Sequence, residues 1–193
     1  LITSQNPTAV LVTGMRRVGK TSLIRTFHSK HRKALKGPVV SIYFSIAEKK
    51  AHLLRDNVSS VIFDTLVRPL IKKFSSENKD HNFYLWKILK EKSQSSGKDF
   101  SQVLRDCYDE QSLADSLKDF SDTILQILGE DFKRVIIIID EAEAFVAPYL
   151  QGGVKAAELD AMFHSFRDVA QDSTSTGILL SGSNHIKSFT NSY

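Results

Sequence analysis

Apolar runs that alternate with stretches of helical periodicity set the pattern of this chain. The runs cover residues 9–13, 39–44, 134–139 and 177–182. They are rich in valine, isoleucine and leucine, which is typical of strands buried in a sheet. The run at 134–139 is the clearest, because its unbroken series of branched side chains indicates burial on both faces. Alternation of such strands with helices predicts a doubly wound α/β fold.

The segments next to these runs have the apolar spacing of amphipathic helices. The first helix is expected to reach about Ala34, and Gly37 and Pro38 should end it, because glycine suits a helix C-terminus and proline cannot continue the helix. A strand–helix–strand crossover then favours parallel pairing of the first strand with the second. Residues 156–171 form the helix expected before the last strand.

A helical insertion, at about residues 53–130, separates the second strand from the third. Within it, a kink or break is expected at Pro69, and residues 93–97 look like a linker. Ser112 and Asp115 form an acid-substituted capping box for the last helix. The helices predicted here cover residues 53–74, 83–92, 100–108 and 113–128.

A phosphate-binding motif lies between the first run and the helix that follows it. Residues 14–21 match G-x-x-x-x-G-K-[ST] between a strand and a helix. Gly14 and Gly19 let the backbone approach a phosphate closely, and the N–H groups of the loop and the helix dipole attract the anion. Lys20 supplies a charge for the β- and γ-phosphates, and Thr21 supplies a hydroxyl for Mg²⁺. The expected nucleotide-binding residues are Gly14, Met15, Arg16, Arg17, Val18, Gly19, Lys20, Thr21 and Ser22.

An acidic pair follows the third run. Asp140 and Glu141 leave that strand at the carboxyl edge, where doubly wound sheets bind ligands. Asp140 is expected to coordinate Mg²⁺, directly or through a water, and Glu141 to orient or deprotonate the attacking water. The alternative is an acidic pair that merely ends a strand. Ser183 and Asn184, after the last run, either contact the γ-phosphate or form an ordinary turn.

These expectations define a small candidate site. Its catalytic residues are Lys20, Glu141 and Asn184, and its metal ligands are Thr21 and Asp140.

Composition adds limits to this picture. The 193 residues are 41% hydrophobic and 25% charged, as expected for one globular domain, and the net charge of +4 gives little support for a dedicated nucleic-acid surface. Cys107 is the single cysteine, which excludes an internal disulfide and fits a cytoplasmic protein.

His28 and His31 are expected to be surface histidines rather than metal ligands. The aliphatic run at 135–139 is far shorter than the ~20 residues that cross a bilayer, so no membrane contact is expected.

The phosphate loop, the apolar run ending in Asp-Glu and the polar residue after the next strand resemble the additional-strand catalytic-glutamate class of P-loop ATPases. Within that class, residues 14–23 look like the archaeal-type ATPases of the STAND group, relatives of AAA+, which often carry an Arg-Arg pair before Gly-Lys-Thr. The resemblance covers residues 9–27, 134–145 and 177–185, and not the helical insertion. Met15 departs from it, since those relatives often have proline there.

This resemblance implies a three-layer P-loop NTPase fold, with a mainly parallel sheet and helices on both faces. It implies ATP and Mg²⁺ as cofactors, and ATP-driven switching that is often coupled to an effector or to DNA transactions. Residues 1–193 are expected to form a single domain. The C-terminal lid or winged helix of the family is expected to be absent, because the chain ends soon after the last strand. The start at Leu1 is consistent with a fragment of a longer protein.

Three functions stay open at this point. The first is a Mg²⁺-dependent ATPase that works as a regulatory switch. The second is a nucleotide-gated binding module with negligible turnover. The third is a DNA-acting ATPase, such as a helicase loader or a transposition helper. Besides ATP, a protein effector, a second copy of the chain and a nucleic acid are all open as partners.

Overall fold

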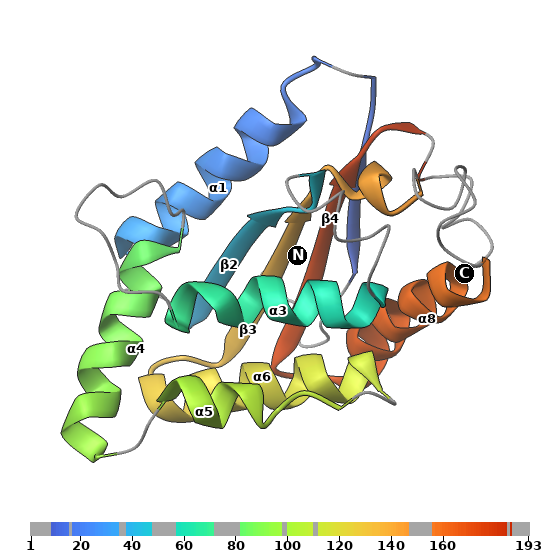
Figure 1. The fold of residues 1–193 in the computed structure, drawn as a ribbon. Helices are drawn as coiled ribbons and strands as arrows, with labels where there is room; N and C mark the ends of the chain where they lie inside the picture. Colours follow the sequence, from blue (N-terminus) through green and yellow to red (C-terminus); the bar gives the residue numbers. More distant parts are fainter. Residues whose placement is uncertain are drawn as a thin grey trace.

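The computed structural model describes residues 9–15, 17–34, 38–47, 57–71, 82–97, 100–109, 112–146, 156–184 and 186. In this part of the chain, four strands form one sheet in the order β1-β4-β3-β2 (Figure 1). All of its pairings are parallel. The strands are β1 (Val10–Thr13), β2 (Val39–Ser45), β3 (Arg134–Asp140) and β4 (Thr176–Gly182). Each of the four apolar runs of the sequence is therefore a strand.

The expected pairing of the first two strands with each other is wrong. β1 pairs with β4, and β2 pairs with β3, so β1 and β2 lie at opposite edges of the described sheet. A crossover connection sets the direction of the second strand but leaves room for other strands between the two. β3 and β4 take the central places, and their apolar runs are buried on both faces.

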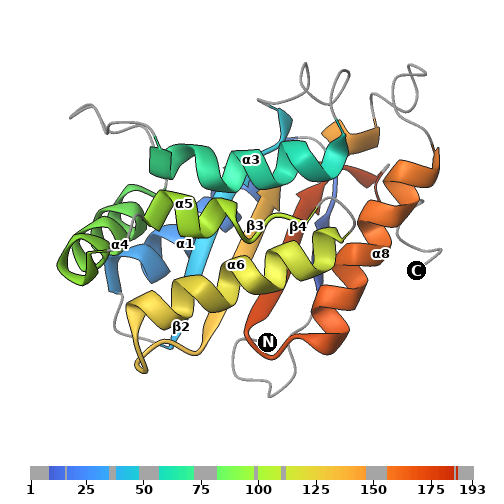
Figure 2. The ribbon, with the colours of Figure 1, turned by 60° about the horizontal axis from the view of Figure 1, so that its bottom comes forward.

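Helices cover both faces of the sheet, as the three-layer fold requires. Figure 2 shows α1 (Lys20–Ala34) behind the sheet, and α3 (Val58–Ile71), α6 (Leu113–Leu128) and α8 (Ala156–Asp172) in front of it. The expected α/β class, with helices on both faces of a parallel sheet, is confirmed. None of the helices in the described ranges combines the length and the apolar character needed to span a membrane.

The two faces of the sheet bury unequal cores. Ile137 and Ile139 join the large cluster under α3, α6 and α8, whereas Ile138 packs with Ile24 of α1 and Tyr43 of β2 in a small one. Each buried aliphatic side chain contributes roughly 1.5–3 kcal/mol, so the large cluster is the main source of stability. Side chains alternate along a strand, so Asp140, two residues after Ile138, faces α1.

The segment between β2 and β3 is helical, as predicted. It contains α3, α4 (Phe83–Ser96), α5 (Phe100–Arg105) and α6. The bounds of α6 match the sequence prediction, and its cap is formed by Ser112, whose side chain accepts a hydrogen bond from the Asp115 amide at 3.1 Å. Trp86 of α4 and Phe120 of α6 are fully buried, which anchors the insertion on the sheet.

Two details of the insertion differ from the prediction. α3 (Val58–Ile71) continues through Pro69, so of the expected kink or break, the break is wrong. Pro69 removes one backbone N–H from this helix without interrupting it. The expected linker at 93–97 is also wrong, because Ser93 to Ser96 continue α4 and Gly97 ends it with φ 70°. A tertiary contact supports this longer helix, since Lys92 Nζ donates to the Leu128 carbonyl at the end of α6.

Candidate functional site

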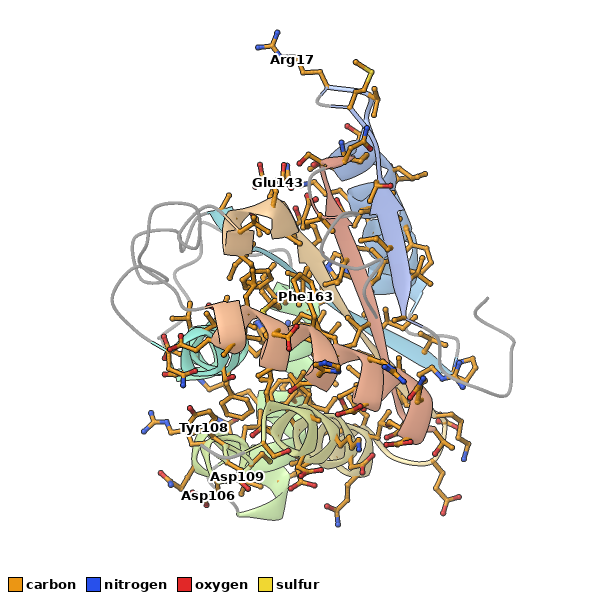
Figure 3. All side chains as sticks on the ribbon, turned by 90° about the vertical axis from the view of Figure 1, so that its right-hand side faces the viewer. Arg17, Asp106, Tyr108, Asp109, Glu143 and Phe163 are labelled. Atoms are coloured by element: carbon orange, nitrogen blue, oxygen red, sulfur yellow. The ribbon has the colours of Figure 1, made fainter. Side chains whose placement is uncertain are left out.

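The loop after β1 projects from the carboxyl edge of the sheet. Figure 3 shows Arg17 at its tip, with the side chain directed away from the molecule. Arg17 and Gly19 have φ of 65° and 90°, so the backbone turns twice through the left-handed region before α1 begins. Met15 and Val18 are 72% and 60% exposed. Arg16, which the sequence also assigns to this site, lies outside the described residues.

Lys20 closes this loop on itself. Its ammonium group donates to the carbonyl oxygens of Gly14 at 2.9 Å and Met15 at 2.7 Å. Thr21 and Ser22 follow in the first turn of α1, and the first helical hydrogen bond runs from the Leu23 amide to the Gly19 carbonyl at 2.9 Å. The cation therefore lies against the loop backbone, where an anion would compete with the two carbonyls for it.

Asp140 is the most buried charge at this edge, with 1% of its surface exposed. Its Oδ1 accepts hydrogen bonds from Ser181 Oγ at 2.5 Å and from the Glu141 amide at 3.0 Å. Its Oδ2 accepts one from the Tyr43 hydroxyl at 2.9 Å. These donors compensate the cost of burying the carboxylate and fix its orientation.

Tyr43 links this carboxylate to α1. Its hydroxyl accepts from Arg25 Nε at 3.2 Å, and the Arg25 guanidinium lies 5.6 Å from the centre of its ring. Burial raises the pKa of Tyr43 to about 12, with the charge of Asp140 adding to the shift and the Arg25 hydrogen bond opposing it. The phenol is therefore protonated at neutral pH and can donate to Asp140. The hydrogen bond from Arg25 to the Tyr43 hydroxyl, together with smaller electrostatic effects, outweighs the effect of burial and raises the pKa of Arg25.

His28 packs beside the same tyrosine. It is 3% exposed, its Nδ1 lies 2.8 Å from Ser41 Oγ, and its ring centre lies 5.8 Å from that of Tyr43. The expectation of a surface histidine is therefore wrong for His28, because α1 turns this face toward β2. The side chain of His31 lies outside the described part.

Glu141 occupies a strained turn at the end of β3. Its φ of 57° and ψ of 38° are left-handed values that cost a residue with a Cβ roughly 1–3 kcal/mol. The turn is held by a hydrogen bond from the Ala144 amide to the Glu141 carbonyl at 2.9 Å. The exposed Glu141 carboxylate accepts from Ser45 Oγ at the end of β2. Strain of this kind is found most often where a side chain must point in a functional direction.

A second acid, Glu143, connects this turn to the end of β4. Its Oε2 accepts a hydrogen bond from the Ser183 amide at 3.2 Å, and Figure 3 shows the side chain at the upper edge of the sheet. A Cβ at Gly182 would lie 3.0 Å from that oxygen and 2.6 Å from Ile186 Cδ1, so a larger residue there would displace the ends of both side chains. Ser183 is buried and its hydroxyl has no partner within the described ranges, whereas Asn184 is exposed.

The strand register brings the predicted pieces to one edge. Thr13 lies opposite Gly182, and Ile139 lies opposite Leu180, so the phosphate loop, the acidic pair and Ser183 all leave the sheet on the same side. One strand, β4, separates the loop from the acidic pair. The ammonium of Lys20 bonds its own loop, and Asp140 bonds Tyr43, Ser181 and Glu141, so the two halves share the edge without bonding each other.

Several residues at this edge are absent from the sequence prediction. Ser45 stands in register with Asp140, and Ser181 continues the neighbouring strand past Leu180. A polar side chain at the end of an apolar strand is a signal that could have found both serines. Tyr43 and Arg25 carry no such signal, because their role depends on β2 being the neighbour of β3.

Comparisons with known proteins place this chain in a family. A family model described as an AAA domain matches residues 3–189. Among solved structures, a Walker-type ATPase of Pyrococcus abyssi is similar at 16% identity and a TM-score of 0.39, over 90% of this chain and 40% of that one. This chain thus spans less than half the length of that protein, and a likeness at this level adds nothing to the assignment. No curated protein matches. Because the family match extends over nearly the whole sequence, the chain belongs to the AAA domain family of P-loop ATPases.

Proposed function

We propose that this domain binds ATP with Mg²⁺, hydrolyses it, and uses the turnover to drive a conformational switch like that of STAND and related AAA+ ATPases. One observation carries the proposal. The loop that contains Lys20 and the buried carboxylate of Asp140 leave one parallel sheet at the same edge, although they lie far apart in the sequence. A triphosphate on the loop would extend along this edge toward the acidic pair.

The loop supplies the anion site in this proposal. Its backbone amides and the N-terminus of α1 attract the phosphates. Lys20 exchanges the carbonyls of Gly14 and Met15 for phosphate oxygens, which are better partners for an ammonium group because they carry full negative charge. The exposed loop offers room for this exchange.

The donor set at the edge fits Mg²⁺. Thr21 and Asp140 offer a hydroxyl and a carboxylate, the hard oxygen ligands that Mg²⁺ prefers. The described residues contain no group of three histidine, cysteine or acidic side chains that could hold a metal by themselves. Mg²⁺ usually takes one or two carboxylates and completes its shell with phosphates and waters, so a site that depends on the nucleotide is expected. Bound there, the ion would neutralise charge on the phosphates.

Glu141 is the residue proposed to hold the proton of the attacking water. It is exposed at the edge and its turn is strained, both of which suit a side chain that must reach a ligand. Asn184, exposed after β4, is proposed to contact the γ-phosphate or that water. The position of β4 between β1 and β3 supports the additional-strand class, since an extra strand stands between the two motifs.

A second candidate function is a nucleotide-gated binding module with negligible turnover. It is favoured by the hydrogen bond from Ser45 to the Glu141 carboxylate, which occupies the proposed base and directs it toward β2. In that case bound ATP would hold one conformation without being consumed.

Phosphate release separates these two functions. We would compare the wild type with Lys20→Ala and Glu141→Gln, using Lys87→Ala and Glu91→Gln as matched controls. Lys87 and Glu91 form an exposed ion pair on α4 at 3.9 Å, so their loss should leave the rate unchanged. Hydrolysis should fall about 100-fold or more in both site variants, the loss expected of a general base. Equal rates in all five proteins would refute hydrolysis at this site. ATP binding without multiple turnovers would select the second function.

A further inference from the structure

Asn82 makes an unusual pair of contacts for a residue at the start of a helix. It precedes α4 in the N-cap position, but its side chain accepts no hydrogen bond from its own helix. Instead, its Oδ1 accepts from the Tyr43 amide at 2.8 Å and its Nδ2 donates to the Tyr43 carbonyl at 2.7 Å. The residue is 6% exposed. One side-chain amide thus satisfies both backbone groups of one strand residue.

These contacts lie on an edge of the sheet. β2 pairs with β3 on one side and is the terminal strand of the described sheet. A backbone N–H and C=O on the open side of an edge strand normally pair with water or with another strand. Asn82 takes that place at Tyr43, so the beginning of α4 is fastened to β2 at this residue.

The side chain of Tyr43 reaches the candidate site. Its hydroxyl donates to Asp140 Oδ2 at 2.9 Å and accepts from Arg25 Nε at 3.2 Å. Its ring packs beside His28. The backbone of Tyr43 is therefore tied to the helical insertion, whereas its phenol holds the carboxylate proposed to act with Mg²⁺.

We propose that Tyr43 is a positioning residue that couples the helical insertion to Asp140, with the Asn82 side chain as the connection to α4. The inference rests on the proposed function, because it takes Asp140 to be the carboxylate that serves Mg²⁺. A shift of the start of α4 moves the backbone of Tyr43, and with it the hydroxyl that orients Oδ2. Coupling between two sites is reciprocal. Binding of Mg²⁺-ATP at the sheet edge therefore also strengthens the two hydrogen bonds between Asn82 and the backbone of Tyr43.

Three variants test this chain of contacts. Tyr43→Phe removes the hydroxyl and keeps the ring. Asn82→Ala removes both hydrogen bonds to the backbone of Tyr43. Asn82→Asp keeps the size and the acceptor for the Tyr43 amide, but sets a second acceptor against the Tyr43 carbonyl. Ser112→Ala is the matched control, since Ser112 holds the N-cap position of the neighbouring helix α6 and its side chain bonds the Asp115 amide rather than β2.

ATP hydrolysis would be measured as a function of Mg²⁺ concentration, alongside ATP binding without Mg²⁺. Tyr43→Phe and Asn82→Ala should each lower kcat roughly 3- to 30-fold, the range seen for residues that couple sites without touching the ligand. Both variants should need a higher Mg²⁺ concentration to reach the half-maximal rate. Their affinity for ATP in the absence of Mg²⁺ should be unchanged. Asn82→Asp should lower kcat at least as much as Asn82→Ala, because a buried carboxylate oxygen then faces the Tyr43 carbonyl without a donor between them. The double variant should lose little more than the stronger single variant, because both changes break one path.

Hydrogen exchange gives a readout that does not depend on hydrolysis. Asn82→Ala should lose protection at the Tyr43 amide, and Mg²⁺-ATP should increase that protection in the wild type. A general loss of stability would affect Ser112→Ala equally, so the control separates positioning from folding. If Tyr43→Phe and Asn82→Ala both keep the kcat and the Mg²⁺ requirement of the wild type, the coupling is overturned. The proposed function would stay intact in that case. A wild type that neither binds nor hydrolyses ATP would overturn the proposed function, and the coupling with it.

Discussion

A buried carboxylate needs compensation, and Asp140 obtains it from neutral donors. The phenol of Tyr43, the hydroxyl of Ser181 and the Glu141 amide satisfy both of its oxygens. An ion pair would have cancelled the charge, but Arg25 reaches Asp140 only through the Tyr43 hydroxyl. The donors therefore orient the carboxylate and leave its negative charge available for a cation, as the proposed role with Mg²⁺ requires.

Close approach at the end of β4 gives a prediction for one glycine. In Gly182→Ala, the new Cβ would lie 2.6 Å from Ile186 Cδ1 and 3.0 Å from Glu143 Oε2, so the ends of these two side chains must shift. The matched control is Gly177→Ala on the same strand, where the nearest atom, Ile136 Cγ1, is 3.7 Å away. Urea denaturation should show a loss of about 1–3 kcal/mol for Gly182→Ala, the usual cost of overpacking.

The same pair of variants also defines the result that would contradict this prediction. Equal stabilities for Gly182→Ala and Gly177→Ala would show that the edge at Glu143 is not closely packed. In that case the hydrogen bond from the Ser183 amide to Glu143 would have no part in shaping the site.

At the scale of elements, α6 was predicted to the residue, and α3 and α4 were not. The strong amphipathic period of α6 and its Ser112 cap are local signals, and local signals can be read from the sequence. Lys92, the last residue of the predicted helix, bonds the end of α6, a contact between residues 36 positions apart, and α4 continues past it to Ser96. This helix ends beyond the apolar positions of its sequence, so sequence periodicity alone does not locate its end.

The cap of α6 carries its own prediction. Ser112→Ala removes the acceptor for the Asp115 amide at 3.1 Å, and losing an N-cap side chain typically costs ~1 kcal/mol. The same substitution at Ser95, whose hydroxyl donates to the Lys92 carbonyl on the exposed side of α4, removes no cap. The midpoint temperature of thermal unfolding should therefore fall for Ser112→Ala and change little for Ser95→Ala. Indistinguishable midpoints would show that the cap adds nothing to the stability of α6.

At the scale of the whole molecule, the site is a consequence of the parallel direction of the strands. The sequence placed Lys20 and Asp140 at strand ends, and parallel strands bring such ends to one edge whatever their order. The order β1-β4-β3-β2 was not predictable from these motifs, because a crossover does not specify the neighbour of its strand. Tyr43 was missed for that reason, since it meets Asp140 only when β2 is the neighbour of β3, whereas Ser45 and Ser181 carry the signal of a polar residue at the end of an apolar strand.

The central claim is that two separate parts of the chain serve one ligand, the loop binding the triphosphate and Asp140 serving its magnesium. Calorimetric titration of ATP, with and without Mg²⁺, tests this on the wild type, Lys20→Ala, Asp140→Asn and the control Lys87→Ala. We expect Lys20→Ala to weaken ATP binding under both conditions. Asp140→Asn should keep Mg²⁺-free affinity and lose the gain that Mg²⁺ gives the wild type and the control. An undiminished Mg²⁺ gain in folded Asp140→Asn would contradict the account.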